Sequence, residues 1–198
     1  MGGYVRNRGA PLTKALGNGA DLETITSATL KRFFERLGEQ LESPATFTLL
    51  GGSALCLLGS PRETLDVDYF IEGPQPEEID ITLKQLSADL ELDLESVLLE
   101  EFIPLPPEAK QRNRFMGRYG QLEVYIFDLY SIALSKIARG FESDLEDVEF
   151  LLNHNLIEWE MLETYFQTIL PRAASADINP KEFQQYFKTL KRKMTGRR

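Results

Sequence analysis

Cysteine and histidine are almost absent from the 198 residues of this chain. The single cysteine, Cys56, stands between two leucines, so the sequence excludes an internal disulfide and a cysteine-rich metal site and predicts a packed thiol. The single histidine, His154, stands between two asparagines, which favours a helix cap or a surface residue over a catalyst. We therefore expect catalysis from neither residue.

Long apolar runs and an excess of positive charge are also lacking. No stretch approaches the roughly 20 apolar residues of a membrane span, and residues 1–20 lack the apolar segment of a signal peptide, so we expect a cytoplasmic protein without a membrane partner. The formal net charge of −9 argues against general attraction to nucleic acid. Only the tail from Lys188 to Arg198 is basic, which fits either a solvated helix end or a local contact with RNA or phosphate.

The chain does contain enough apolar residues for a core, and the spacing of these residues divides it into three segments. With 42% hydrophobic and 27% charged residues, the composition is that of an ordinary globular protein. Residues 1–20 have glycine, proline and asparagine without periodicity, so we expect a loose arm. Residues 21–128 alternate helical and extended patterns, whereas residues 129–198 have helical patterns only. The sequence thus predicts an α/β or α+β lobe followed by a C-terminal helical lobe.

The spacing of apolar residues predicts the individual elements. Helices are predicted over residues 22–41, 54–58, 76–90, 129–139, 143–152, 157–170 and 180–194. Strands are predicted over residues 47–50, 65–71, 97–103, 114–119 and 122–127, the last two as a hairpin. The predicted caps are Thr24 or Ser27 for the first helix, Asp128 and Gly140 for the helix over 129–139, a capping box from Ser143 to Glu146, and Asn179.

A bare turn, Gly51-Gly52-Ser53, follows the predicted strand over residues 47–50 and opens a helix. Without side chains at two positions, backbone N–H groups can approach a phosphate, and the helix N-terminus adds partial positive charge. The Ser53 hydroxyl would add a donor. The alternative is an ordinary turn, because Gly-Gly before a helix is common.

Two carboxylates, Asp66 and Asp68, follow this turn at the start of the next predicted strand. Side chains two residues apart on a strand point to the same face, so the two carboxylates project together. Such a pair is tolerable with a hard cation between its members, and Mg²⁺ is commonly held by one or two carboxylates plus substrate phosphates. The alternative is an exposed, purely structural strand face.

The turn and the two aspartates resemble the signature of the DNA polymerase β-type nucleotidyltransferase superfamily. Further along the chain, the segment from Leu134 to Gly140, which contains Lys136, and the segment from Asp144 to Val148 are similar to a lysine followed by Asp-x-x-Asp in bacterial abortive-infection (AbiEii) and MenT-like nucleotidyltransferases. These motifs cover the chain from Phe47 to about Leu152. The resemblance implies an α+β fold with a nucleotidyltransferase-type mixed β-sheet, flanking helices and a helical lobe.

The resemblance also implies roles for these residues. Gly51, Gly52 and Ser53 would bind the phosphates of a nucleotide, and Asp66 and Asp68 would be catalytic ligands of Mg²⁺. A third carboxylate commonly completes the metal site on a neighbouring strand. Glu123 is our candidate because it interrupts an otherwise apolar strand face, and Asp128 is its rival, although it also fits a helix cap.

The residues of the second motif have alternative interpretations. Lys136 lies in a largely apolar helical segment, so it either extends to solvent or points into the cleft at a nucleotide phosphate, and the resemblance favours the cleft. Arg139 would pair with Asp144, Asp147 or a phosphate. Asp147 either fixes Lys136 or acts on the acceptor as a catalytic residue, and a structural role for Asp144 and Asp147 is at least equally compatible with the sequence.

We therefore expect an Mg²⁺-dependent nucleotidyltransferase that transfers a nucleoside monophosphate from a nucleoside triphosphate. The resemblance implies tRNA or a protein as acceptor, a toxin-like activity and an antitoxin partner. The alternative is a degenerate nucleotide- or partner-binding module of the same fold, and a position of Glu123 far from Asp66 and Asp68 would favour it.

Overall fold

The structure is a computed structural model that describes residues 24–196. The predicted arm over residues 1–20 lies outside the described residues, as do the last two arginines of the basic tail. In the described part of the chain all strands lie before residue 127 and only helices follow it, so we refer to residues 24–128 as the sheet lobe and to residues 129–196 as the helical lobe. None of the helices in the described part of the chain combines the length and the apolar character that crossing a bilayer requires.

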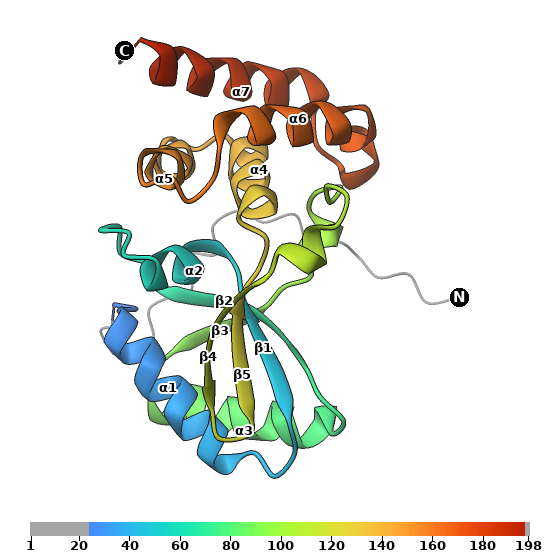
Figure 1. The fold of residues 1–198 in the computed structure, drawn as a ribbon. Coiled ribbons are helices and arrows are strands. Elements are labelled where there is room, and N and C mark those ends of the chain that lie inside the picture. The colour runs from blue at the N-terminus through green and yellow to red at the C-terminus, as the bar shows by residue number, and fades with distance from the viewer. Residues whose placement is uncertain (1–23, 197–198) are drawn as a thin grey trace, which may run out of the picture.

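A five-stranded mixed sheet forms the centre of the sheet lobe, in the order β3-β2-β1-β5-β4 (Figure 1). β1 pairs parallel with β5, and β2 pairs parallel with β3, whereas the β1–β2 and β4–β5 pairs are antiparallel. The strands are β1 (Ala45–Leu49), β2 (Asp66–Glu72), β3 (Asp93–Ser96), β4 (Arg114–Tyr119) and β5 (Leu122–Ile126). This arrangement confirms the predicted α+β fold.

Helices flank this sheet and build the helical lobe. α1 packs against β4, β5 and α3, whereas α4 packs against α5, α6 and α7 at the other end of the molecule (Figure 1). The helices are α1 (Ser27–Gln40), α2 (Gly51–Leu57), α3 (Pro76–Asp89), α4 (Leu129–Arg139), α5 (Glu142–Asn153), α6 (Trp159–Ile169) and α7 (Pro180–Thr195), with the short 3-10 helices η1 (Leu99–Glu101), η2 (Ala109–Arg112) and η3 (Leu170–Ala176).

The core of the sheet lobe is aromatic. Phe33 and Phe34 of α1 lie edge-on to Phe47 of β1, and the Phe47 ring stacks on Tyr69 of β2 with 4.9 Å between centroids. The three phenylalanine side chains are almost completely buried. Because α1 and the sheet share this cluster, burial of apolar surface fixes the helix on one face of the sheet.

A second aromatic cluster joins α6 and α7 in the helical lobe. The rings of Phe166 and Phe187 are stacked with 3.9 Å between centroids, and Phe183 packs edge-on to Phe166.

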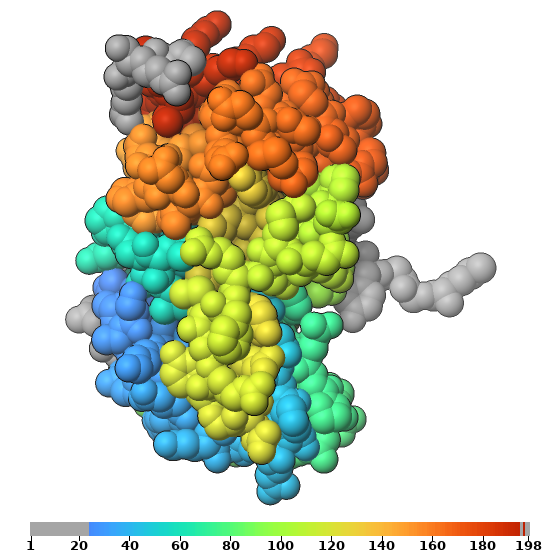
Figure 2. Space-filling view, in the orientation of Figure 1, coloured from blue at the N-terminus to red at the C-terminus, as the bar shows by residue number. Residues whose placement is uncertain are grey.

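The two lobes are also in direct contact, since the Arg172 guanidinium donates to the Leu105 carbonyl over 3.0 Å. Figure 2 shows the helices packed on the sheet lobe, with the segment before β4 touching them.

Local capping explains several element boundaries. The Asp128 carboxylate accepts from the Ser131 amide at the start of α4, Gly140 adopts a left-handed conformation at its end, and Asn179 caps α7, all as predicted. The cap of α1 is Thr26, not Thr24 or Ser27. The predicted capping box from Ser143 to Glu146 does not form, because α5 begins one residue earlier, at Glu142.

One predicted strand is misplaced. Residues 97–103 are not a strand but a turn and the 3-10 helix η1, and the strand β3 lies just before them. The pairing with β2 places Asp93 opposite Asp66 and Ser96 opposite Tyr69, so the ladder ends where the apolar run begins. Leu99 and Ile103 are buried from this turn rather than from a strand face.

Candidate active site

The Gly-Gly turn lies directly against the second strand aspartate. Gly51, the first residue of α2, has φ +55°, and a Cβ atom built on it would lie 1.6 Å from Oδ2 of Asp68. At Gly52 a Cβ atom would lie 2.7 Å from the Thr64 hydroxyl. The turn therefore needs glycine for its backbone conformation and because Asp68 and Thr64 approach the backbone so closely.

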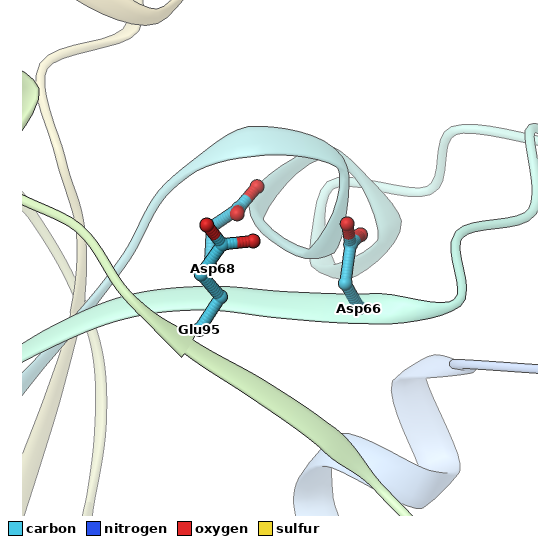
Figure 3. A group of neighbouring side chains, drawn as sticks. All are labelled: Asp66, Asp68 and Glu95. Atoms are coloured by element: carbon cyan, nitrogen blue, oxygen red, sulfur yellow. The ribbon is translucent and has the colours of Figure 1, made fainter. Parts of the chain in front are cut away.

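Three carboxylates meet beside this turn. Asp66 and Asp68 project from β2 and Glu95 from β3, and one oxygen of each lies within 4.8 Å of the others (Figure 3). The parallel register explains the arrangement, because Asp68 and Glu95 are paired neighbours on adjacent strands. The Thr64 hydroxyl donates to Oδ1 of Asp66 over 2.8 Å and fixes its orientation. We call these three carboxylate residues the acidic cluster.

The acidic cluster is electrostatically unfavourable on its own. Burial, together with repulsion from Asp66 and Glu95, raises the pKa of the Asp68 carboxyl to about 6. The positive charges of Arg139 and Lys136 oppose this rise. Three carboxylates at this separation offer the oxygen ligands that Mg²⁺ prefers, and a divalent cation would remove their repulsion. The residues present therefore fit a divalent metal ion.

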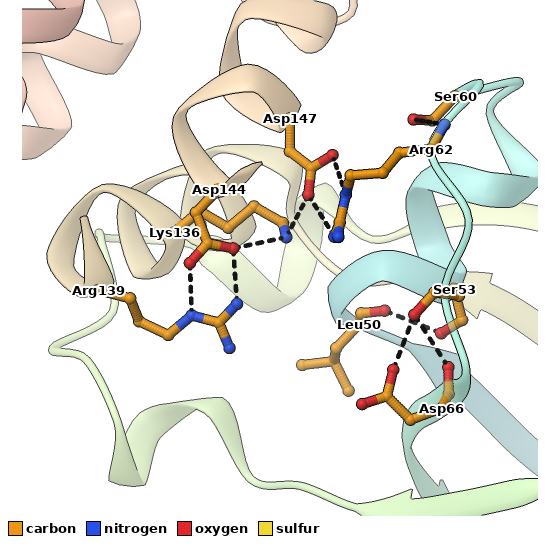
Figure 4. A network of polar contacts seen from close by, with 10 residues as sticks. Leu50, Ser53, Ser60, Arg62, Asp66, Lys136, Arg139, Asp144 and Asp147 are labelled. Carbon is orange, nitrogen blue, oxygen red and sulfur yellow. Dashed lines mark hydrogen bonds and ion pairs between the residues drawn. The ribbon is translucent and has the colours of Figure 1, made fainter. Parts of the chain in front are cut away.

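A cationic network lies next to the acidic cluster and contains side chains of the helical lobe and Arg62 of the sheet lobe (Figure 4). Lys136 of α4 is only 3% exposed, and its ammonium group donates to Asp147 over 2.7 Å and to Asp144 over 3.3 Å. The Arg139 guanidinium binds Asp144 through two hydrogen bonds of 2.8 and 2.6 Å. Arg62, from the loop after α2, binds Asp147 through two more, of 2.8 and 2.7 Å. Lys136 is therefore buried in this network and does not extend to solvent.

The network carries excess positive charge, because three cationic side chains share the carboxylates of Asp144 and Asp147. The hydrogen bonds to Asp147 and Asp144 raise the pKa of Arg62 and Arg139, respectively. Burial would raise the pKa of Asp144, but Arg139 and Lys136 together lower it. The two aspartates therefore hold the three cations in fixed positions through charge-assisted hydrogen bonds.

The acidic cluster and the three cationic side chains of Arg62, Lys136 and Arg139 line the same cavity, which has a volume of about 590 Å³ and lies between the two lobes. This volume lies in the range of pockets that bind small molecules. The predicted site residues that line the cavity are Gly51, Gly52, Asp66, Asp68, Lys136 and Arg139. The structure thus brings most of the predicted nucleotide and metal residues to one place.

Ser53 and Asp147, two further predicted site residues, are buried and do not line the cavity. The Ser53 side chain is fully buried, and its hydroxyl donates to the Leu50 carbonyl over 3.1 Å, so it is not available as a phosphate donor. Asp147 is 2% exposed and is not among the residues that line the cavity. Because its oxygens accept from Lys136 and Arg62, its position fits the predicted role of fixing Lys136 and not contact with an acceptor.

Neither predicted third carboxylate reaches the acidic cluster. Glu123 of β5 pairs with Thr46 of β1. Thr46 in turn pairs with Glu72, which is the last residue of β2, whereas Asp66 is the first. The Glu123 carboxylate is hydrogen-bonded to Arg118 and Tyr125, and the Arg118 contact lowers its pKa. Asp128 is occupied as the α4 cap and by two hydrogen bonds from Arg112. Glu95 takes the third position instead.

Sequence analysis missed Glu95 and Arg62. Glu95 belongs to an alternating segment, Asp93-Leu94-Glu95, that pairs with β2, and this alternation was a usable signal once the strand was placed correctly. Arg62 follows Gly59-Ser60-Pro61 in a loop, and its partner Asp147 lies far away in the sequence. No local pattern predicts that ion pair.

A mixed sheet with a Gly-Gly turn, paired strand aspartates and a helical lobe that supplies cations defines a nucleotidyltransferase-type protein. The comparison with protein families agrees: the model of the family described as "Nucleotidyltransferase of unknown function (DUF6036)" matches residues 28–194. The chain belongs to this family. Neither the curated proteins nor the solved structures gave a match.

Proposed function

We propose that the chain is an Mg²⁺-dependent nucleotidyltransferase that transfers a nucleoside monophosphate from a nucleoside triphosphate to an RNA or protein acceptor. The observation that carries the proposal is the cavity in which the acidic cluster lies beside Lys136 and Arg139. A triphosphate with a divalent cation needs both kinds of charge at once, carboxylates for the cation and fixed positive groups for the phosphates.

Each side of the cavity has its own task in the proposed reaction. Asp66, Asp68 and Glu95 would hold Mg²⁺, which, when bound, neutralises and orients the triphosphate. Lys136 and Arg139 attract the phosphates and are held in place by Asp144 and Asp147. In the transfer, an acceptor hydroxyl loses its proton to water and its oxygen forms a bond to the α-phosphorus. The bond from that phosphorus to the oxygen that bridges to the β-phosphate breaks, and pyrophosphate leaves with this oxygen. No covalent bond to the protein is required.

Calorimetric titration of the four common nucleoside triphosphates, with and without Mg²⁺, tests the proposal. Wild-type protein should bind at least one of them in an Mg²⁺-dependent manner, and an Asp66→Asn/Asp68→Asn variant should lose this binding. Asp89→Asn is the matched control, because Asp89 is an exposed carboxylate on α3 that pairs with Arg36 away from the cavity. Absence of Mg²⁺-dependent binding by the wild type would contradict the proposed function.

The acceptor and the biological role follow from the resemblance to abortive-infection and MenT-like enzymes. We propose a toxin-like activity on tRNA or a protein side chain, controlled by an antitoxin partner in the cytoplasm. For RNA, the basic part of α7 supports the proposal, since Lys188 is exposed there. Deletion of the tail would also remove the buried Leu190, so Lys188→Ser is the sharper variant. Weaker tRNA binding in a gel shift is expected, and unchanged affinity would remove RNA contact at this helix.

One observation supports a second function, a binding module without turnover. Glu123, the carboxylate predicted to complete the metal site, lies away from Asp66 and Asp68. The position of Glu95 supports catalysis instead, since it restores the number of carboxylates. The two functions separate experimentally: the binding module binds Mg²⁺ and nucleotide but releases no pyrophosphate in the presence of any acceptor.

A further inference from the structure

The cavity has an apolar wall besides its charged groups. Its lining includes Val97, Leu99, Phe102, Ile132 and Ile178, from both lobes. The apolar wall begins close to the acidic cluster along the chain, because Glu95 of the cluster is followed within two residues by Val97. A ligand whose phosphates contact the charged groups can therefore place another part against this wall.

Phe102 is the unusual residue of this wall. Its neighbours Leu99 and Ile103 are 7% and 0% exposed, and hydrogen bonds from the amides of Phe102 and Ile103 to the Leu99 carbonyl close the turn. The Phe102 side chain, in contrast, is 56% exposed although it lines the cavity. A phenylalanine ring held in water by a well-anchored turn forgoes the gain of burial, which a flat apolar ligand would restore.

We propose that this apolar wall is the nucleobase site of the enzyme and that the Phe102 ring stacks on the base. This inference rests on the proposed function, because it assigns the second half of the same substrate. Aromatic stacking suits it, since every base has a π-face and every nucleoside triphosphate presents one at a fixed distance from its phosphates.

Polar groups near the apolar wall can contact the edge of the base. The oxygen of the Asn179 side chain accepts from the amides of Lys181 and Glu182 over 3.0 and 3.5 Å, so its amide nitrogen is the group left to donate to a ligand. Glu182, which also lines the cavity, offers an acceptor. A nucleobase presents both donors and acceptors on its edge, whereas inorganic polyphosphate presents no comparable group.

The test compares two ligands that share the phosphates and differ in the base. Mg²⁺-nucleoside triphosphate and Mg²⁺-tripolyphosphate are titrated into the wild type, Phe102→Ala, Phe102→Tyr and Phe115→Ala. Phe115→Ala is a matched control, because Phe115 of β4 is also 56% exposed but does not line the cavity. Circular dichroism and urea unfolding verify that each variant is folded.

We expect Phe102→Ala to weaken nucleotide binding by roughly five- to a hundredfold, the range that stacking of one base provides. Tripolyphosphate binding should not change, Phe102→Tyr should retain nucleotide affinity, and Phe115→Ala should bind like the wild type. If Phe102→Ala binds nucleotide as tightly as the wild type, or loses both ligands equally, the nucleobase site is wrong while the proposed function stands. If the wild type binds neither ligand, both proposals fall.

Discussion

At the scale of single residues, Asp68 combines burial with repulsion. Its pKa is raised to about 6 by burial and by the charges of Asp66 and Glu95. Because the folded pKa lies above that of the unfolded chain, the protonated carboxyl favours folding. Without divalent ions, the contribution of Asp68 to stability should be complete below about pH 4 and disappear as the pH rises through about 6. A shift of this size corresponds to at most about 3 kcal/mol.

Urea unfolding between pH 4 and 8 in the presence of a chelator measures this effect. The free energy of unfolding of the wild type should decrease over this range relative to that of Asp68→Asn, because the asparagine side chain has no proton to lose and stays uncharged. Asp89→Asn should follow the wild type, since Asp89 is exposed. Parallel pH curves for the wild type and Asp68→Asn would show that the carboxyl is not in the environment described.

Glu95 and Glu123 provide a second prediction at this scale. Both are strand carboxylates, and the same substitution to glutamine should have different effects on Mg²⁺-dependent nucleotide binding at the two positions. Glu95→Gln should weaken Mg²⁺-dependent nucleotide binding roughly tenfold or more, since it removes a charged ligand from the acidic cluster. Glu123→Gln should leave binding unchanged, because the Glu123 carboxylate is bonded to Arg118 and Tyr125 away from the cluster. Calorimetric titration with Mg²⁺ decides between them, and the opposite ranking would restore Glu123 to the metal site.

The candidate site shows which residues a sequence reveals. The Gly-Gly turn, Asp66 and Asp68 were predictable because short-range patterns, a bare turn and a two-residue alternation, place them, whereas only the resemblance favoured an inward Lys136. Glu95 was missed because its strand was predicted four residues too late. Arg62 was missed because an ion pair across 85 residues leaves no local pattern. Glu123 was proposed from its polarity alone, which does not distinguish the two ends of a sheet.

At the scale of elements, the turn from β1 into α2 gives a prediction with an internal control. Gly51 and Gly59 flank α2 with φ +55° and +88°, but a Cβ atom meets Asp68 only at Gly51 and, among the described residues, nothing within 4 Å at Gly59. Gly59→Ala should cost only the backbone strain of about 1–2 kcal/mol. Gly51→Ala should cost roughly 1–3 kcal/mol more and displace Asp68.

Urea unfolding and Mg²⁺-nucleotide titration of the two variants give the readouts. Gly59→Ala should bind like the wild type, whereas Gly51→Ala should lose Mg²⁺-dependent binding. Equal stability and equal affinity of the two variants would mean that Asp68 does not approach the turn so closely.

The elements themselves were largely predictable. Apolar periodicity predicted the helices, because each buries one face, and it predicted β5 of the β4–β5 hairpin, because alternate residues of β5 are buried. Caps with a side-chain acceptor, Asp128 and Asn179, were predicted correctly, since they act over a few residues. The strand order was not available from periodicity, because pairing between β1 and β5 joins segments that are distant in the chain.

At the scale of the whole molecule, the pair of Arg62 and Asp147 connects the lobes next to the cavity. Arg62 belongs to the sheet lobe and Asp147 to α5, and the carboxylate is 2% exposed. Because Asp147 also accepts a hydrogen bond from Lys136, the pair links the sheet lobe to a cation that we propose binds phosphate. Loss of the pair should therefore affect both the stability of the molecule and its affinity for nucleotide.

A double-mutant cycle of Arg62→Ala and Asp147→Ala measures this connection. Asp147→Ala should be the more destabilising, by roughly 3–5 kcal/mol, because it leaves the buried Lys136 with one carboxylate fewer. The coupling energy of the pair should be about 1–3 kcal/mol, as expected for groups within one network. The exposed pair of Arg36 and Asp89 is the control, with an expected coupling below about 1 kcal/mol. Equal coupling in the two cycles would mean that the Arg62–Asp147 pair contributes no more than an exposed ion pair and that Arg62 is only a surface charge. A larger coupling, together with weaker tripolyphosphate binding by Arg62→Ala, would show that the fold uses this ion pair to set the geometry of the cavity.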